Sequence, residues 1–299
     1  MDEAAAPRLS PSRGPGSPDV WGLHDPATGS VQYVLACPET RAAAIVDPVL
    51  DYLPSAGRVS TGNAEALLAL AAREGLRTLR ILDTHPHADH MTASAWLAAR
   101  TQAPTAIGAR TRDVARLWAG LYNLPALASA EGYDAYLEDG AAFELGALRI
   151  EAVLTPGHTM ASVAYACGDA MLVHDTLMQP DLGTSRADFP GGSAEALWDS
   201  IQTILARPPG TRLFIGHDYR PGGRPAAWES TVAEQREANV HVGGGRSREA
   251  FLELRRARDA TLPLPERMLA ALQVNLRGGR LPEPEGDGHS YLKIPLDRF

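Results

Sequence analysis

The 299-residue chain has a net charge of -8 and 44% hydrophobic residues, which is enough for a sizeable core in one large domain or two small ones. The acidic balance argues against a nuclease, because a polyanionic partner would be repelled. No apolar run approaches the ~18 residues of a membrane span, and the N-terminus lacks the basic and apolar regions of a signal peptide. We therefore expect a cytoplasmic protein that binds neither membrane nor nucleic acid.

The first segment, residues 1–18, is rich in Ala, Pro, Ser, Gly and Arg without a period, which predicts a disordered N-terminal tail. Two strand-like runs at residues 30–37 and 42–47 flank a turn containing Pro and predict a hairpin. A helical period follows from Thr61, with Asn63 as a candidate cap and Gly75 as its end.

A buried strand at residues 79–83 is followed directly by Thr84-His85-Pro86-His87-Ala88-Asp89-His90. Imidazole nitrogens and a carboxylate on the turn after a strand suit zinc, iron or manganese. The alternative is a solvated polar loop that is merely rich in His. Four potential ligands at closely spaced positions make that the weaker interpretation.

Strand and helix then alternate, with a helix expected at residues 91–100 and a strand at 104–107. Antiparallel strands are expected from residue 140 onward, and a helix capped by Ser193 is expected to end at Leu205. A strand at 211–215 and a helix at 225–239 complete this part. Cys37 and Cys167 lie in apolar runs, which favours two core residues over a disulfide.

The C-terminal segment, residues 243–299, contains two amphipathic helical patterns, at about 248–258 and 265–275, and a tail with many Pro and Gly residues. The run Arg255-Arg256-Ala257-Arg258 is most simply a solvated helix face. A site for an anionic partner is the less favoured interpretation.

Further polar residues follow other strand-like runs, in Thr155-Pro156-Gly157-His158, Val173-His174-Asp175 and Ile215-Gly216-His217-Asp218-Tyr219. One His beside a strand is more often a core or surface residue than a ligand. Several strand ends that each carry His or Asp, two of them with a Gly that permits close backbone approach, indicate a shared metal site.

Together with Asp47, which closes the strand-like run at 42–47, these residues resemble, in order, the five motifs of the metallo-β-lactamase superfamily over about residues 20–240. The resemblance implies an α/β fold, a four-layer αββα sandwich of two mixed β-sheets flanked by helices. It also implies a domain at 19–242, on which the helical extension and tail at 243–299 are expected to pack. In dinuclear members the first metal takes the positions of His85, His87 and His158, the second takes those of Asp89, His90 and His217, and Asp175 bridges.

A narrower resemblance lies in Arg186-x-Asp188-Phe189 and His217-Asp218-Tyr219, which are similar to motifs of the persulfide dioxygenases, glyoxalase-II-related members that hold one iron. The loop between Asp175 and Arg186 is longer here, and a Cys often found near the Arg is absent. The sequence of the segment 272–284 also resembles bacterial β-lactamase-like hydrolases of sulfide-detoxification operons.

This resemblance implies one Fe(II) per chain, bound by His85, His158 and Asp175. His87, Asp89, His90 and His217 would surround these ligands, or bind metal themselves in a dinuclear site. It assigns catalytic roles to Asp89, His90 and His217 and places Arg186 and Tyr219 near the substrate, although a phenol such as Tyr219 can equally belong to a core. Asp47 and Asp188 are expected to be structural acceptors.

The implied reaction is the oxidation of glutathione persulfide, or another low-molecular-weight persulfide, with O2 to sulfite and the thiol. The alternative is a glyoxalase-II-type thioesterase with one or two Zn(II) that hydrolyses glutathione thioesters. A non-catalytic metal-binding sensor is disfavoured by the complete ligand set. The sequence leaves the oligomeric state open, including a homodimer.

Overall fold

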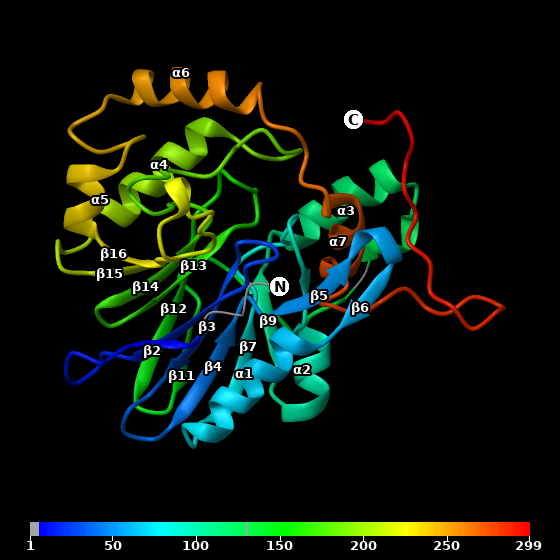
Figure 1. Ribbon diagram of the computed structural model, residues 1–299, viewed down its shortest axis with the longest axis horizontal. Helices are drawn as coiled ribbons and strands as arrows, with labels where there is room; N and C mark the ends of the chain where they lie inside the picture. Colours follow the sequence, from blue (N-terminus) through cyan, green and yellow to red (C-terminus); the bar gives the residue numbers. More distant parts are fainter. Residues whose placement is uncertain (1–5, 130) are drawn as a thin grey trace.

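The computed structural model describes residues 6–129 and 131–299, and these form two large β-sheets packed face to face with helices outside (Figure 1). The first sheet has the strand order β1 (Arg8–Ser10), β2 (Asp19–His24), β3 (Val31–Ala36), β4 (Ala42–Val46), β7 (Arg77–Leu82), β9 (Thr105–Gly108) and β10 (Ala135–Leu137). The second has the order β11 (Ala142–Leu145), β12 (Leu148–Leu154), β13 (Val163–Cys167), β14 (Ala170–His174), β15 (Arg212–Ile215) and β16 (Glu229–Thr231).

Both sheets are mixed. In the first, β4 pairs with β7 in parallel and with β3 antiparallel. In the second, β14 pairs with β15 in parallel and with β13 antiparallel. A small third sheet, which the sequence did not predict, contains β6 (Arg58–Ser60), β5 (Val49–Leu53) and β8 (Met91–Thr92).

Side chains along the central strands point alternately to the two faces of the sheet, so the core is divided into layers. On β3, Val31, Tyr33 and Leu35 belong to the apolar cluster between the two sheets. The intervening Val34 and Ala36 belong to a second cluster, on the outer face of the first sheet. Successive side chains of a strand point to opposite faces, so β3 is buried on both sides.

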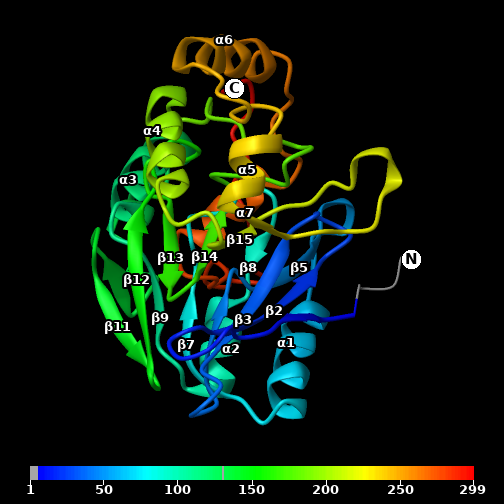
Figure 2. The ribbon, with the colours of Figure 1, turned by 90° about the vertical axis from the view of Figure 1, so that its left-hand side faces the viewer.

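Helices cover the outer face of each sheet. The outer face of the first sheet packs on α1 (Gly62–Arg73), α2 (Ser94–Thr101) and α7 (Met268–Asn275). The second sheet is covered by α4 (Ala194–Leu205), which α5 (Val232–Ala238) and α6 (Arg248–Asp259) contact. In Figures 1 and 2, α6 lies at the opposite end of the molecule from α1 and α2. The four-layer αββα sandwich is thus confirmed.

The remaining helix, α3 (Thr111–Tyr122), shares an apolar cluster with α7. Within residues 6–129 and 131–299 there are also three short 3-10 helices, η1 (Pro54–Ala56), η2 (Pro125–Ser129) and η3 (Pro221–Gly223). No helix in the described parts of the chain has the length and apolar character needed to cross a membrane.

The prediction of a disordered tail at residues 1–18 is wrong for most of that segment. Strand β1 pairs antiparallel with β2, and the buried guanidinium of Arg212 donates to the carbonyl oxygens of Ser10 and Pro18 while pairing with Asp169 at 3.0 Å. Residues 1–5 lie outside the described part of the chain.

Three local predictions also differ from the structure. The expected helix at 225–239 is divided between β16 and α5, because residues 229–231 pair with β15. Asn63 lies inside α1, which begins after Thr61 without a side-chain cap. Ser193 does cap α4, since its hydroxyl accepts a hydrogen bond from the Ala196 amide.

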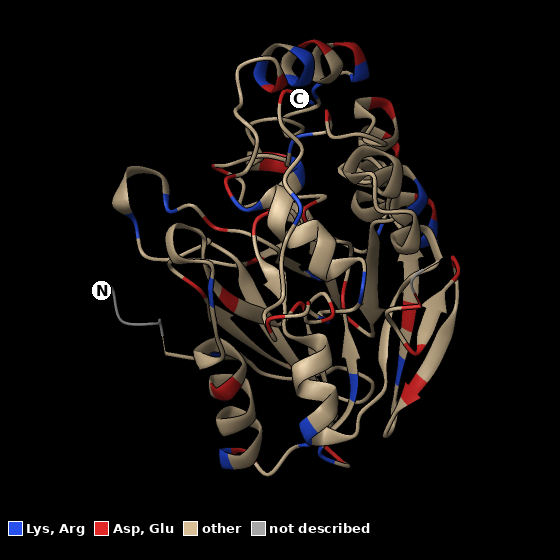
Figure 3. Ribbon diagram, turned by 90° about the vertical axis from the view of Figure 1, so that its right-hand side faces the viewer, with Lys and Arg blue, Asp and Glu red and all other residues tan. Residues whose placement is uncertain are grey.

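The expected solvated face on α6 is wrong for one residue. Figure 3 shows acidic and basic residues interspersed along this helix, and Arg256 and Arg258 are indeed exposed. Arg255, however, is only 1% exposed.

Candidate metal centre

The ends of β7, β12, β14 and β15 bring polar side chains to one edge of the sandwich. The His85 loop follows β7, and His158 lies on the turn after β12. Asp175 follows β14 directly, and His217 follows β15. The two sheets thus contribute to one site.

Three of the predicted ligands converge closely. The Oδ2 atom of Asp175 lies 3.7 Å from His85 Nε2 and 3.5 Å from His158 Nε2. All three side chains are buried, and one ligand atom from each lies within 4.8 Å of the others. His85 Nε2 has no hydrogen-bond partner despite its burial. Buried polar atoms are normally satisfied, so this donor set fits a metal ion held by two imidazoles and one carboxylate.

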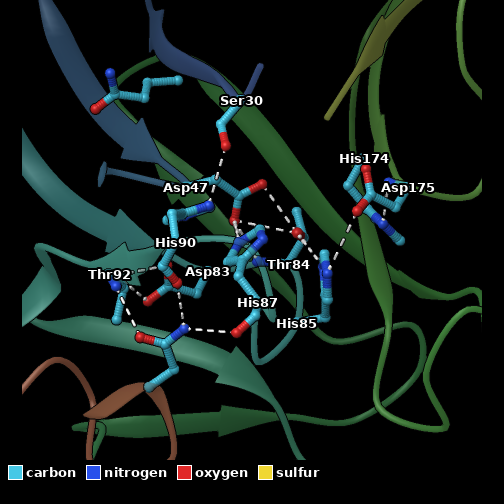
Figure 4. Close-up of polar contacts among 12 residues, drawn as sticks. Ser30, Asp47, Asp83, Thr84, His85, His87, His90, Thr92, His174 and Asp175 are labelled. Carbon is cyan, nitrogen blue, oxygen red and sulfur yellow. Dashed lines mark hydrogen bonds and ion pairs between the residues drawn. The ribbon is translucent and has the colours of Figure 1, made fainter. Parts of the chain in front are cut away.

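Hydrogen bonds on the far side of each imidazole fix its orientation. His85 Nδ1 lies 3.0 Å from the Thr84 hydroxyl, which lies 2.9 Å from the carboxylate of Asp47 (Figure 4). His158 Nδ1 donates to the carbonyl oxygen of Arg186 at 2.9 Å. With Nδ1 protonated in both rings, each Nε2 presents a lone pair toward Asp175.

The protonation states also suit metal binding. Burial and the neighbouring imidazoles lower the pKa of His85 well below its usual range, and burial lowers the pKa of His158. Burial alone would raise the pKa of Asp175, but the charge and hydrogen bond of His217 outweigh it and lower this pKa. Neutral imidazoles and an ionised carboxylate are the forms that bind metals.

A second set of predicted residues is linked by hydrogen bonds. His217 lies between two carboxylates, with Nδ1 2.5 Å from Asp175 Oδ1 and Nε2 2.6 Å from Asp89 Oδ2. These carboxylates outweigh burial and raise the pKa of His217. His90 Nδ1 lies 2.9 Å from the same Asp89 oxygen. Asp175 thus contacts His217 through Oδ1, while its Oδ2 faces His85 and His158.

His87 shares no ligand-atom group with the three convergent ligands, although its ring centroid lies 4.1 Å from that of His85. Its Nε2 atom is 2.9 Å from Asp47 Oδ1, and its Nδ1 atom is buried without a partner. Its ligand atoms group with those of Asp89 and His90, or with those of Asp47 and Asp83. Asp47 also accepts from the Thr84 amide at 2.7 Å, in agreement with the acceptor role expected for it.

Several residues that support the site were not predicted. Ser30 donates to Asp89 Oδ2 at 2.8 Å. Asn275, at the end of α7, donates to the carbonyl oxygens of both His87 and His90 at 2.8 Å. Thr84 belongs to the stretch 84–90 that the sequence singled out, although no role was predicted for its hydroxyl, whereas nothing in the sequence connects Ser30 or Asn275 with that stretch.

A cavity of about 560 Å³ opens beside the convergent ligands. The candidate substrate residues Arg186 and Tyr219 both line it, and its outer wall is the segment 262–266 that joins α6 to α7. Tyr219 is 56% exposed and stacks on His217, with ring centroids 5.7 Å apart.

Arg186 is held by several contacts within the protein. Its guanidinium donates to both carboxylate oxygens of Asp188, at 2.6 and 2.7 Å, and to the carbonyl oxygen of Pro263 at 2.5 Å. The side chain is 11% exposed. Most of its donors are therefore used within the protein.

Comparison with known proteins identifies the fold family. The family model described as "Metallo-beta-lactamase superfamily" matches residues 26–217. The chain is 53% identical over 282 residues to a "Beta-lactamase hydrolase-like protein" of Xylella fastidiosa, covering 94% of this chain but only 65% of that longer relative. It is 39% identical to "Glyoxylase B2" of Dictyostelium discoideum, with 93% of this chain and 96% of that protein covered.

More distant similarities include proteins named ETHE1. The chain is 28% identical to the human mitochondrial persulfide dioxygenase ETHE1, with 91% of this chain and 93% of that protein covered. The crystal structure of ETHE1 from Myxococcus xanthus superposes with a TM-score of 0.70 at 29% identity, covering 87% of this chain and 98% of that one. The chain belongs to the metallo-beta-lactamase superfamily.

Proposed function

We propose that this chain is an iron-dependent persulfide dioxygenase with one Fe(II), held by His85, His158 and Asp175. The observation that carries the proposal is the convergence of these three side chains into one set of ligand atoms. Two imidazoles and one carboxylate with open positions are typical of non-haem Fe(II) oxygenases. The similarity to the human persulfide dioxygenase supports the same assignment.

In the proposed reaction, glutathione persulfide, O2 and water yield glutathione and sulfite. The outer sulfur atom is oxidised by four electrons, and O2 is reduced by the same four. Fe(II) held by His85, His158 and Asp175 would bring the persulfide sulfur and O2 together and allow electrons to pass between them. Asp89, His90 and His217 do not bind the iron in this proposal. His217 instead holds Asp175 in place through a hydrogen bond to Oδ1. Asp89 contacts the other ring nitrogen of His217, and His90 contacts the same Asp89 oxygen.

The cavity suits a small thiol carrier. Its volume of about 560 Å³ lies within the roughly 300–1,000 Å³ of small-molecule sites. Arg258 and Glu266 also line it and offer one charge of each sign, and glutathione carries both carboxylates and an ammonium group. Tyr219, which stacks on His217 at the cavity, is positioned to hydrogen-bond the substrate. Arg186 instead shapes the cavity, because it holds Pro263 in the cavity wall.

A dinuclear zinc thioesterase is the second candidate. All seven residues of the dinuclear ligand set are present, and the chain is 39% identical to a protein named Glyoxylase B2. In that case His87, Asp89, His90 and His217 would also bind Zn(II), and the metals would activate a water for attack on a thioester carbonyl.

The two candidates differ in their substrates. Protein loaded anaerobically with Fe(II) should consume O2 in step with sulfite formation when glutathione persulfide is added in air. The same protein should hydrolyse lactoylglutathione poorly. Rapid hydrolysis of lactoylglutathione without O2 uptake on any persulfide would exclude the dioxygenase in favour of the thioesterase.

A further inference from the structure

A loop at residues 184–189 supports two of the proposed metal ligands. The carbonyl oxygen of Arg186 accepts the hydrogen bond that orients His158. The hydroxyl of Ser185 donates to the carbonyl oxygen of Asp175. A displacement of this loop would therefore move both ligands.

Helix α6 holds the loop through a buried ion pair. Arg255 and Asp259 are only 1% and 7% exposed, and Arg255 Nη2 lies 2.8 Å from Asp259 Oδ1. The second carboxylate oxygen of Asp259 accepts from the Ala187 amide at 3.1 Å. Arg255 Nη1 donates to the carbonyl oxygen of Thr184 at 3.1 Å. Each charge thus pairs with the other and with a backbone group of the loop.

Stability alone does not explain such a pair, because desolvation of two charges commonly cancels their attraction. The pair does supply hydrogen-bond partners for two backbone groups of the loop, the Ala187 amide and the Thr184 carbonyl oxygen. Buried backbone groups outside strands and helices need such partners. The planar fork of an arginine binds carboxylate and carbonyl in a fixed geometry. The pair therefore fixes the loop to α6 at Thr184, before Arg186, and at Ala187, after it.

We propose that the Arg255–Asp259 pair is a positioning element of the metal centre. It holds residues 184–187 so that the Arg186 carbonyl keeps His158 Nε2 directed at Asp175. The C-terminal extension would then take part in metal binding without supplying a ligand. This inference rests on the proposed metal site but not on the proposed reaction.

The test is a titration of the full-length, metal-free protein with Co(II), followed by its visible absorption spectrum. Asp259→Asn and Arg255→Met should weaken Co(II) binding by about 10–100-fold, as is typical when partners of metal ligands are lost, and should change the spectrum. Arg256→Ala is the matched control, because Arg256 lies on the same helix as the pair while its exposed side chain pairs with Glu195 of α4 at 2.8 Å. This control should match the parent protein.

Asp259→Asn preserves the volume of the side chain, so it carries the test if Arg255→Met fails to fold. Folded Asp259→Asn with the affinity and spectrum of the control would overturn the inference. So would the failure of both variants to fold, because the pair would then serve the fold as a whole. Tight Co(II) binding by the parent protein, together with the expected loss of Co(II) affinity in the variants, would support the inference. This holds even if iron-loaded protein oxidised no persulfide.

Discussion

The hydroxyl of Thr84 sets the tautomer of His85, and its removal provides a sharp test of the metal centre. The hydroxyl lies 2.9 Å from Asp47 Oδ2 and 3.0 Å from His85 Nδ1. Because an ionised carboxylate can only accept, the single hydroxyl hydrogen points to Asp47, and the hydroxyl oxygen accepts from His85 Nδ1–H. His85 Nε2 is thereby left with a lone pair for the metal.

Thr84→Val keeps the shape of the side chain and removes this link. It leaves one buried imidazole donor unpaired, which costs about 1–3 kcal/mol of unfolding free energy. The Thr84 amide keeps its own bond to Asp47 Oδ1 at 2.7 Å, so the loop should stay attached. With its ring no longer fixed, His85 should bind metal about 10–100-fold more weakly.

The assay combines urea unfolding of the metal-free protein with titration by Fe(II) under anaerobic conditions. Thr84→Ser is the control, because it retains the hydroxyl and should bind metal within a few-fold of the parent. Equal Fe(II) affinity in the Val and Ser variants would refute the role assigned to the hydroxyl.

Three other perturbations have defined outcomes. His158→Ala should abolish metal binding, whereas His87→Ala should retain one iron and lose about 10–100-fold in rate; equal metal loss in elemental analysis of both would contradict the single-iron site. Tyr219→Phe should raise KM for the persulfide several-fold without lowering the melting temperature, because the phenol is exposed; an unchanged KM would exclude a substrate contact. Burial, together with nearby arginines, lowers the pKa of His241 to about 4, so the unfolded chain binds more protons than the folded protein between about pH 6.5 and pH 4. Stability should therefore fall on acidification through this window, and parent protein should lose roughly 2–3 kcal/mol more than His241→Asn between pH 7 and pH 4.5; equal losses in urea unfolding would show that His241 does not titrate this way.

The metal-ligand candidates could be predicted because each is encoded locally. A buried strand followed by His or Asp is visible within a few residues, as at His85 and Asp175, and strand ends of packed sheets meet at one edge. The groups that orient these ligands are not local. Asn275 reaches the His87 and His90 carbonyls from α7, a contact that depends on how the chain folds back.

The wrong predictions share a cause, which is that tertiary contacts override local composition. The N-terminal segment looks disordered by composition, yet the buried Arg212, 202 residues further along the chain than Ser10, holds it in place. Arg255 lies in a basic run, and only the nearby loop at 184–187 makes it a buried residue. At residues 229–231, pairing with β15 outweighs the helical pattern.

Reconstitution with defined metals tests most directly whether one Fe(II) at His85, His158 and Asp175 supports oxygen-dependent chemistry. Metal-free protein should be reconstituted anaerobically with either one equivalent of Fe(II) or two equivalents of Zn(II), and O2 uptake with glutathione persulfide should then be measured. We expect one tightly bound iron per chain and one O2 consumed per sulfite formed, with no uptake by the zinc protein. Two tightly bound zinc ions per chain, together with an iron-loaded protein that consumes no O2, would contradict the claim.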